Sequence, residues 1–208
     1  PRLEVNRPTL VSDHQFGTSL REISFSVRGG EILGIGGIAG NGQTELMDAL
    51  SGEVYSGKPQ AILIDGAPAG HMGPSQRRSI GASFVPEERN GHGAVSAMTL
   101  SENAFLSGHI RHSLAKMGLI NHGKTTEFAQ EVIRTFDVRT VGPKAQARAL
   151  SGGNLQKFVI GREVLQKPKV LVVSQPTWGV DAGAAAAIHQ AIIELANDGT
   201  AVVLISQD

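Results

Sequence analysis

A glycine-rich stretch near residue 40 constrains the fold of this chain more than any other feature. The short apolar run Ile32–Ile35 indicates a buried strand, and it leads into a glycine-rich loop at residues 36–42. From Gln43 to Leu50, polar and apolar residues alternate as they do in an amphipathic helix. A strand, a glycine loop and a helix in this order present backbone N–H groups and the positive end of the helix dipole to a phosphate. We therefore predict an anion-binding loop here.

The loop matches the phosphate-loop pattern of Gly, four residues, Gly, Lys and then Ser or Thr at all positions but one. Gly37, Gly42 and Thr44 fit, whereas Gln43 stands where the pattern has lysine. A tight turn is the alternative interpretation of such a run. The run also fits the looser dinucleotide-binding fingerprint, but that fingerprint needs an acidic residue about 20 positions later, and Glu53 comes too early.

Composition excludes several classes of function. The 19 basic residues equal the 19 acidic ones, so no basic surface points to nucleic acid. The chain has no cysteine, which rules out disulfides. No apolar run approaches the ~20 residues that span a bilayer, so we expect any membrane role to depend on a partner.

Strand patterns at both ends of the chain enclose a helical middle. We expect strands at 3–11, 23–27, 61–64, 82–85, 170–173 and 201–205 and helices at 75–79, 100–106, 126–136 and 184–195. Gly29 and Gly30 indicate an antiparallel hairpin between the strand at 23–27 and the glycine loop's strand. The last two strands and the helix between them form a parallel crossover unit. The fold class is α/β, with a helical insertion from Glu87 to Gly161.

A second anion-binding pattern lies near the end of the helical insertion, at Leu150-Ser151-Gly152-Gly153-Asn154-Leu155-Gln156. Serine and two glycines begin a helix that we expect to run to about Leu165. Its free N–H groups and hydroxyl suit a phosphate. The alternative is an ordinary helix cap, which Ser151 alone satisfies.

These motifs resemble those of ABC transporter ATP-binding subunits, whose signature is Leu-Ser-Gly-Gly followed by a polar residue. The resemblance covers essentially all 208 residues. It is greatest to the second, C-terminal ATPase half of tandem subunits that serve simple-sugar and nucleoside importers. Three stretches carry that similarity: Gly40–Leu46, Val85–Arg89 as a Q-loop counterpart, and Gln175–Asp181. Residues 173–176 replace an acidic pair usual in sugar-type members, which favours the nucleoside type.

The resemblance implies a P-loop NTPase-like ABC ATPase domain with a parallel-sheet core, an antiparallel β subdomain and a helical subdomain. Residues 1–208 would be a single domain, with the core and β subdomain at 1–86 and 162–208 and the helical subdomain at 87–161. It also implies a fragment, because members of the family continue beyond the position of Asp208 and carry a first ATPase half.

The resemblance also implies the cofactors ATP and Mg²⁺. Thr44 would be a weak Mg²⁺ ligand. Phe16 would stack on adenine, with core packing as the alternative, and Glu87 would link the ATP site to the helical subdomain, with a solvated loop acid as the alternative. The full set of expected nucleotide contacts is Phe16, Gly37, Ala39, Gly40, Asn41, Gly42, Gln43, Thr44, Glu45, Glu87, Leu150, Ser151, Gly152, Gly153, Asn154, Ser174, Gln175 and Asp181.

Four side chains depart from the family's chemistry. Gln43 replaces the phosphate-neutralising lysine, Ser174 the aspartate that supports Mg²⁺, Gln175 the general-base glutamate and Gln207 the switch histidine. Loss of a general base alone costs ~10²–10⁴-fold in rate. We therefore expect no intact catalytic residue at this loop. The hypothesis is that this half lends its signature motif to a competent phosphate loop in a partner half.

The resemblance also implies partners. They are a second ABC ATPase half, an integral membrane permease docked on 87–105, and a solute-binding protein reached through the permease; no nucleic acid is expected. A plain surface loop is the alternative at 87–105. The domain would be peripheral to the cytoplasmic face of the membrane. Alternatives are a structural half that never binds nucleotide, a soluble ABC ATPase outside transport, and, remotely, a dinucleotide-dependent oxidoreductase.

Overall fold

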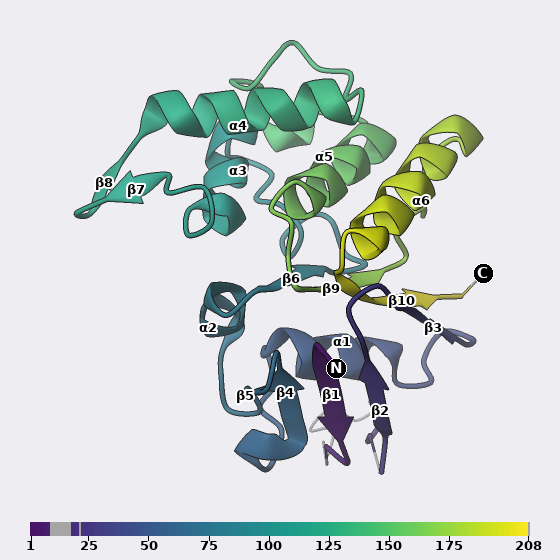
Figure 1. Cartoon of the computed structure of the whole chain (residues 1–208). Helices are drawn as coiled ribbons and strands as arrows, with labels where there is room; N and C mark the ends of the chain where they lie inside the picture. The colour runs from purple at the N-terminus through teal and green to yellow at the C-terminus, as the bar shows by residue number, and fades with distance from the viewer. Residues whose placement is uncertain (9–17, 21, 208) are drawn as a thin grey trace. The chain divides into compact units, whose positions relative to one another are not determined.

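The computed structural model describes residues 1–8, 18–20 and 22–207 (Figure 1). Phe16, the expected adenine-stacking residue, lies outside the described residues. The chain forms two compact units. The first contains Pro1–Phe84, Pro168–Gln175 and Ile193–Asp208, and the second contains Val85–Lys167 and Pro176–Ile192. No helix among the described residues is long and apolar enough to cross a bilayer.

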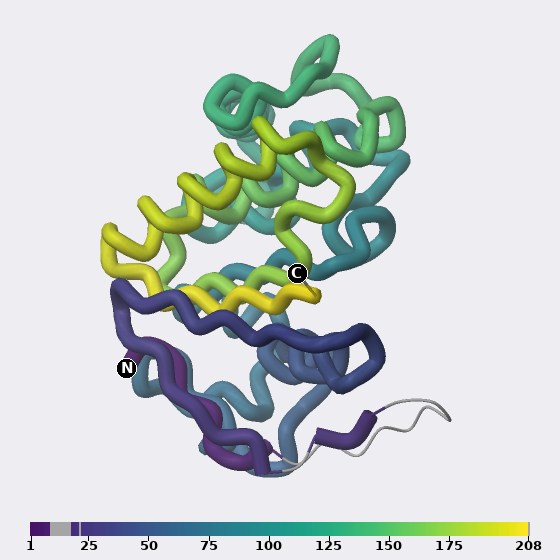
Figure 2. Tube along the Cα trace, turned by 90° about the vertical axis from the view of Figure 1, so that its right-hand side faces the viewer, coloured from purple at the N-terminus to yellow at the C-terminus, as the bar shows by residue number. Residues whose placement is uncertain are grey.

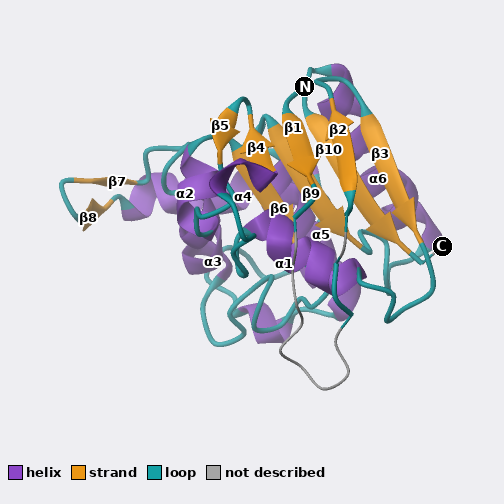
Figure 3. Ribbon diagram, turned by 90° about the horizontal axis from the view of Figure 1, so that it is seen from below, coloured by secondary structure: helices purple, strands orange, loops and turns teal. Residues whose placement is uncertain are grey.

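The first unit contains two four-stranded sheets. The antiparallel sheet has the order β2-β1-β4-β5, and its strands lie side by side in Figure 3. They are β1 Leu3–Asn6, β2 Ser24–Val27, β4 Ile62–Ile64 and β5 Ala67–Pro68. The second sheet has the order β3-β10-β9-β6, and in it β10 pairs in parallel with β3 and β9. Its strands are β3 Ile32–Gly36, β6 Ala82–Val85, β9 Val170–Ser174 and β10 Ala201–Ser206.

The predicted hairpin before the glycine loop is wrong, because β2 and β3 belong to different sheets. Gly30, at φ 89°, donates its N–H to the Thr200 carbonyl (3.1 Å), and the Glu31 carbonyl accepts from Val202 (2.9 Å). These bonds put the chain in register with β10 after the turn, so it does not fold back on β2. β3 lies at the sheet edge and Ile32 is 42% exposed, so this strand is not buried as predicted.

Helix α1 (Gln43–Ser51) lies between the two sheets (Figure 1). Its buried side chains Leu46, Met47, Ala49 and Leu50 join residues of both sheets in one apolar core. This burial fixes the helix that follows the glycine loop. The short elements of this unit are η1 Pro59–Ala61 and α2 Pro74–Ser79.

The second unit is largely helical. Its helices are α3 Leu100–Gly108, α4 His122–Thr135, η2 Ala147–Ala149, α5 Gly152–Val164 and the greater part of α6 Ala182–Asn197. The predicted helices are therefore confirmed. The prediction that this region contains no strands is wrong, because β7 Ala115–Lys116 and β8 Leu119–Ile120 form a hairpin. Its turn residues Met117 and Gly118 both have left-handed φ angles, of 53° and 79°, as a type I′ turn requires.

A buried polar network holds the segment before α3 to the helices of this unit. Arg162, on α5, donates to the carbonyls of Asn103 (3.0 Å) and Gly93 (2.9 Å) and pairs with Glu163 (3.0 Å). The Asn103 side chain accepts from the Val95 N–H at 2.8 Å. Because these polar groups are buried and mutually satisfied, the network fixes the backbone at residues 93–99.

The buried ring of His112 should make the stability of the folded chain depend on pH. Its ring stacks on Phe128 with centroids 4.0 Å apart, and its buried Nε2 has no hydrogen-bond partner among the described residues. Burial lowers the pKa of His112; Arg111 acts in the same direction and Glu131 opposes it. The unfolded chain therefore binds a proton at higher pH than the folded one. The contribution of neutral His112 to the free energy of unfolding is fully present above the ordinary histidine pKa of about 6.5. It is lost as the pH falls from there toward the lower pKa of His112 in the folded chain.

We expect urea unfolding to give a lower free energy at pH 5.5 than at pH 7.5, and His112→Phe to reduce that difference. Carboxylates contribute little to it, because they titrate near pH 4 in the unfolded chain. An unchanged difference in His112→Phe would contradict the assignment.

Candidate functional site

The carboxyl ends of three parallel strands bring the first group of predicted site residues together. Ser206 lies opposite Gly36, and Ile205 lies opposite Ser174. The N–H of Gly37 donates to the Ser206 carbonyl at 3.3 Å. Figure 2 shows the end of β3, in purple, beside the end of β10, in yellow. The glycine loop therefore begins at the sheet edge that also carries Gln175 and Gln207.

The glycine loop connects β3 to α1 through two left-handed residues. Gly40 has φ 83° and Gly42 has φ 101°, conformations that favour glycine over any residue with a Cβ. A Cβ on Gly42 would lie 3.0 Å from Leu20 Cδ2, so a larger residue there would also have to displace the Leu20 side chain. Gly42 precedes the first residue of α1, which gives the loop the strand-to-helix geometry of an anion site.

The Gln43 side chain folds back into this loop. Its Oε1 accepts the Asn41 backbone N–H at 3.0 Å, and its Nε2 donates to the Ile38 carbonyl at 2.9 Å. A Cβ on Gly37 would lie 2.8 Å from Nε2, which places the amide against the start of the loop. Gln43 thus satisfies one loop N–H that a phosphate would otherwise use, and it brings no positive charge.

The residues after Gln43 differ in their surroundings. The Glu45 carboxylate accepts the Thr18 N–H at 2.8 Å, and the Thr18 hydroxyl donates to the Gly40 carbonyl at 3.0 Å. Glu45 therefore holds residue 18 against the loop. Thr44 is exposed, as are Ala39 and Asn41. A hydroxyl at Thr44 suits Mg²⁺ as a single ligand, but the described residues contain no group of three or more His, Cys, Asp or Glu side chains that could hold a metal ion.

Ser174 and Gln175 lie at the end of β9, and both are buried. Gln175 has a left-handed φ of 49°, which is uncommon for a residue other than glycine. Its N–H donates to the Ile205 carbonyl at 2.9 Å, and its Oε1 accepts the Gln207 N–H at 3.4 Å. The residues at the predicted general-base and switch-histidine positions are thus joined by a bond from the Gln207 backbone N–H to the Gln175 side chain, and neither side chain accepts a proton near pH 7.

The second group of site residues lies in the second unit, at the start of α5. Ser151 is the N-cap, and its Oγ accepts from the backbone N–H (3.4 Å) and Nδ2 (2.9 Å) of Asn154. Asn154 Oδ1 accepts the Arg139 N–H at 2.9 Å. Ser151 and Gly152 are exposed, and Leu150 and Gly153 are half-buried. The helix start thus presents an exposed hydroxyl beside N–H groups of its first turn.

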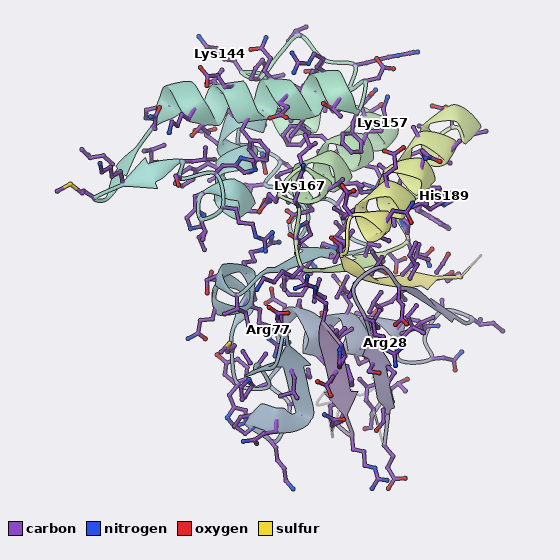
Figure 4. All side chains as sticks on the ribbon, in the orientation of Figure 1. Arg28, Arg77, Lys144, Lys157, Lys167 and His189 are labelled. Carbon is purple, nitrogen blue, oxygen red and sulfur yellow. The ribbon has the colours of Figure 1, made fainter. Side chains whose placement is uncertain are left out.

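A cavity of about 410 Å³ lies beside this helix start and is lined by Ser151, Asn154, Lys157 and Asp181 among others. Lys157, labelled in Figure 4, donates to the Asp137 carbonyl. The Asp181 carboxylate accepts the Ala184 N–H at 3.0 Å, and this bond holds its pKa below the ordinary value. Asp181 thus caps α6, a structural role that accompanies its predicted one.

The structure therefore places the predicted residues in two groups, one in each unit. The loop residues meet Ser174, Gln175 and Gln207 in the first unit, and the signature meets Asp181 in the second. Glu87, also in the second unit, is exposed. The sequence places Arg89 at the end of the predicted Q-loop counterpart Val85–Arg89 but indicates no role for its side chain, which bonds the Trp178 carbonyl 89 positions away. No local pattern signals such a contact.

Comparisons with known proteins identify the family. Residues 20–178 match the sequence model of the family described as ABC transporter. The guanosine import ATP-binding protein NupO of Bacillus subtilis (strain 168) is 37% identical over 94% of this chain and 38% of its own length. The ribose import ATP-binding protein RbsA 1 of Rubrobacter xylanophilus is 37% identical over 91% of this chain and 38% of its own length. The chain thus spans well under half the length of these relatives.

Solved structures agree on the fold. A dimeric ATP-binding cassette in a post-hydrolysis state, bound to ADP and Pi, superposes with a TM-score of 0.81 at 19% identity, covering 99% of this chain and 88% of that one. A nucleotide-free ATP-binding cassette gives a TM-score of 0.72 at 21% identity, covering 99% and 81%. On the family match over residues 20–178, the chain belongs to the ABC transporter family, as an ATP-binding domain.

Proposed function

We propose that this chain is the degenerate nucleotide-binding half of an ABC importer ATPase. It supplies its signature motif to a partner half, and its own phosphate loop contributes little to hydrolysis. The observation that carries this proposal is the contrast between the two helix starts. The loop before α1 holds the uncharged Gln43 amide among its backbone groups, whereas the α5 start exposes Ser151.

The charge balance at the loop supports a weak site. ATP carries several negative charges, and phosphoryl transfer depends on neutralising them with lysine, arginine or Mg²⁺. Gln43, Ser174, Gln175 and Gln207 are all uncharged. The residues present do not fit a hydrolytic ATP·Mg²⁺ site, and Thr44 alone would hold Mg²⁺ only weakly.

The signature side supports a contribution to the partner's site. Ser151 Oγ and the N–H groups of the first turn of α5 are donors of the kind that stabilise charge developing on a γ-phosphate. Asn154 fixes the position of the Ser151 hydroxyl at 2.9 Å. Donors held in place before the reaction cost no reorganisation when charge develops.

The relatives' names extend the proposal to the whole assembly. Matching proteins are named for import of guanosine, nucleosides, ribose and xylose. We therefore assign uptake of a nucleoside or simple sugar, driven by ATP through a second ATPase half and a membrane permease that receives the solute from a binding protein. The domain would sit at the cytoplasmic face, in the C-terminal half of a tandem chain.

Calorimetric titration of the chain with ATP·Mg²⁺ tests the loop. We expect a dissociation constant near or above about 1 mM. Gln43→Lys should bind about tenfold more tightly, because it adds a cation to an uncharged loop. Gly40→Asp is the matched control and should abolish binding, because it adds a negative charge to the loop. A Cβ at Gly40 has open space around it, and aspartate tolerates left-handed φ better than most residues. Micromolar binding by the unmodified chain would contradict the degenerate site.

A second function is favoured by the Gln43 contacts alone. If the amide never leaves the loop, this half binds no nucleotide and completes the ATPase dimer structurally. The same titration separates the two functions: the structural half predicts no heat with the unmodified chain at millimolar ATP.

A further inference from the structure

Arg89 connects three segments of the second unit that are far apart in sequence. It lies in the loop that follows β6, and its Nη2 donates to the Trp178 carbonyl at 2.6 Å. The side chain is partly buried, and burial lowers the pKa of its guanidinium. A partly buried guanidinium bonded to a distant carbonyl is more than a solvated loop charge, because its desolvation has to be offset by its contacts.

Two glycines make room for this guanidinium. A Cβ on Gly152, the first residue of α5, would lie 2.6 Å from Arg89 Nη1, and a Cβ on Gly179 would lie 2.9 Å from Nη2. Arg89 therefore packs directly against the second residue of the signature triplet Ser151–Gly153. It also packs against the residue two positions before Asp181. Glycine at residue 152 thus has a steric reason in addition to any contact with nucleotide.

The backbone around Arg89 is itself held in place by hydrogen bonds. Its carbonyl accepts the Ala94 N–H at 2.6 Å, and the Glu88 carbonyl accepts the Gly93 N–H at 3.0 Å, so the loop closes on itself. The buried Arg162 of α5 holds the Gly93 carbonyl at 2.9 Å. The Arg89 guanidinium therefore extends to the signature motif from a loop whose backbone is held in place.

A side chain of α5 also bonds this distant segment directly. Gln156 Nε2 donates to the Pro176 carbonyl at 3.0 Å, one turn farther along the helix. Among the described residues, Arg89 and Gln156 together hold the start of α5 against residues 176–179. Arg89 is the one that also belongs to the loop beginning at Glu87.

We infer that Arg89 is a positioning residue for the signature motif. It sets the first turn of α5 relative to the segment leading to Asp181, and it couples both to the loop at residues 87–94. The inference rests on the proposed function in that the signature acts on a partner's ATP. Arg89 itself contacts neither the partner's loop nor the nucleotide in this role.

The first test uses Trp178, the only tryptophan in the chain. Arg89→Ala removes the bond to its carbonyl, so we expect lower fluorescence anisotropy and stronger acrylamide quenching of Trp178. Arg148→Ala is the matched control, because the side chain of this exposed arginine of the same unit donates to Gln146; the variant should leave both signals unchanged. Equal signals in Arg89→Ala and the unmodified chain would overturn the inference.

The second test measures ATPase kinetics of the assembled transporter. Arg89→Ala should lower kcat by about tenfold and leave KM for ATP within about twofold, since misplacing a donor affects the transition state more than nucleotide binding. Arg89→Lys should recover part of kcat, because an ammonium can bond the Trp178 carbonyl but cannot pack flat on Gly152. A rise in KM at unchanged kcat, or no recovery with lysine, would overturn a positioning role.

A double variant tests the contact with Gly152 directly. A Cβ at residue 152 needs the space of Arg89 Nη1, so Gly152→Ala should displace the guanidinium and reproduce part of the Arg89→Ala loss. We expect the combined variant to lose less activity than the product of the two single losses. Losses that multiply would show that the two residues act separately, which overturns the coupling.

The two proposals fail in different ways. If Ser151→Ala leaves ATPase activity intact, the proposed function fails, and the Trp178 signals still test whether Arg89 holds the segment. If Ser151→Ala removes activity and Arg89→Ala does not lower kcat, only the positioning inference is overturned.

Discussion

Replacing Ser151 with alanine should lower the ATPase activity of the assembled transporter by about 100-fold, the usual effect of removing one preorganised donor from a transition state. Ser151 Oγ stands exposed at the start of α5, where the helix dipole is positive. A γ-phosphate bound by a partner half develops charge that this hydroxyl stabilises. The measurement is steady-state ATP hydrolysis by the reconstituted transporter at saturating ATP.

This loss of ATPase activity has to be separated from the loss of stability that follows when a helix cap is removed. Ser151 caps α5, and Asn121 caps α4 of the same unit by accepting the Lys124 N–H at 3.0 Å. Removing either cap destabilises its helix by about 1 kcal/mol. Asn121→Ala should therefore lower stability as Ser151→Ala does, but keep ATPase activity within about twofold. Equal activity losses in both variants would mean that Ser151 acts only as a cap.

Replacing Arg77 with methionine should destabilise the first unit by about 3 kcal/mol. Arg77 is fully buried on α2 and donates to the carbonyls of Ala49, Leu50 and Met72 (Figure 4). Two of these carbonyls end α1, which lacks a basic residue of its own in its last turn. Burial lowers the pKa of Arg77 to about 10, so it remains charged near neutral pH. Methionine fills the space but leaves the carbonyls unsatisfied.

Arg78 provides the matched control for this prediction. It follows Arg77 on α2 but is only partly buried, and its guanidinium lies 5.6 Å from the centroid of the Phe84 ring. Arg78→Met should cost no more than about 1 kcal/mol. Urea unfolding followed by circular dichroism measures both. A loss in Arg77→Met no larger than in Arg78→Met would contradict the role of Arg77 at the end of α1.

The elements that local patterns define could be predicted from the sequence. The run Val170–Val173 and the stripe from Ala184 to Leu195 carry their own periodicity, so strand, helix and strand are confirmed as β9, α6 and β10. The glycine loop and the helix after Ser151 could be predicted for the same reason, because glycine and cap residues determine the backbone within a few positions of themselves.

Pairing and long-range contacts could not be predicted. A turn at Gly30 is compatible with a hairpin or with a change of sheet, and the Thr200 carbonyl that decides between them lies 170 positions away. The β7–β8 turn at Met117 lacks the usual asparagine. The folding of the Gln43 amide into the loop, and the bond from Arg89 to Trp178, depend on tertiary geometry that residue type does not encode.

The most direct test of the central claim compares Gln43→Ala with Ser151→Ala in the assembled transporter, by steady-state ATP hydrolysis at matched protein levels. If this half supplies its signature and little else, Gln43→Ala should stay within about twofold of the unmodified transporter while Ser151→Ala loses about 100-fold. The reverse ranking would contradict the account, because it would make the loop at Gln43 the working site and the Ser151 helix start dispensable.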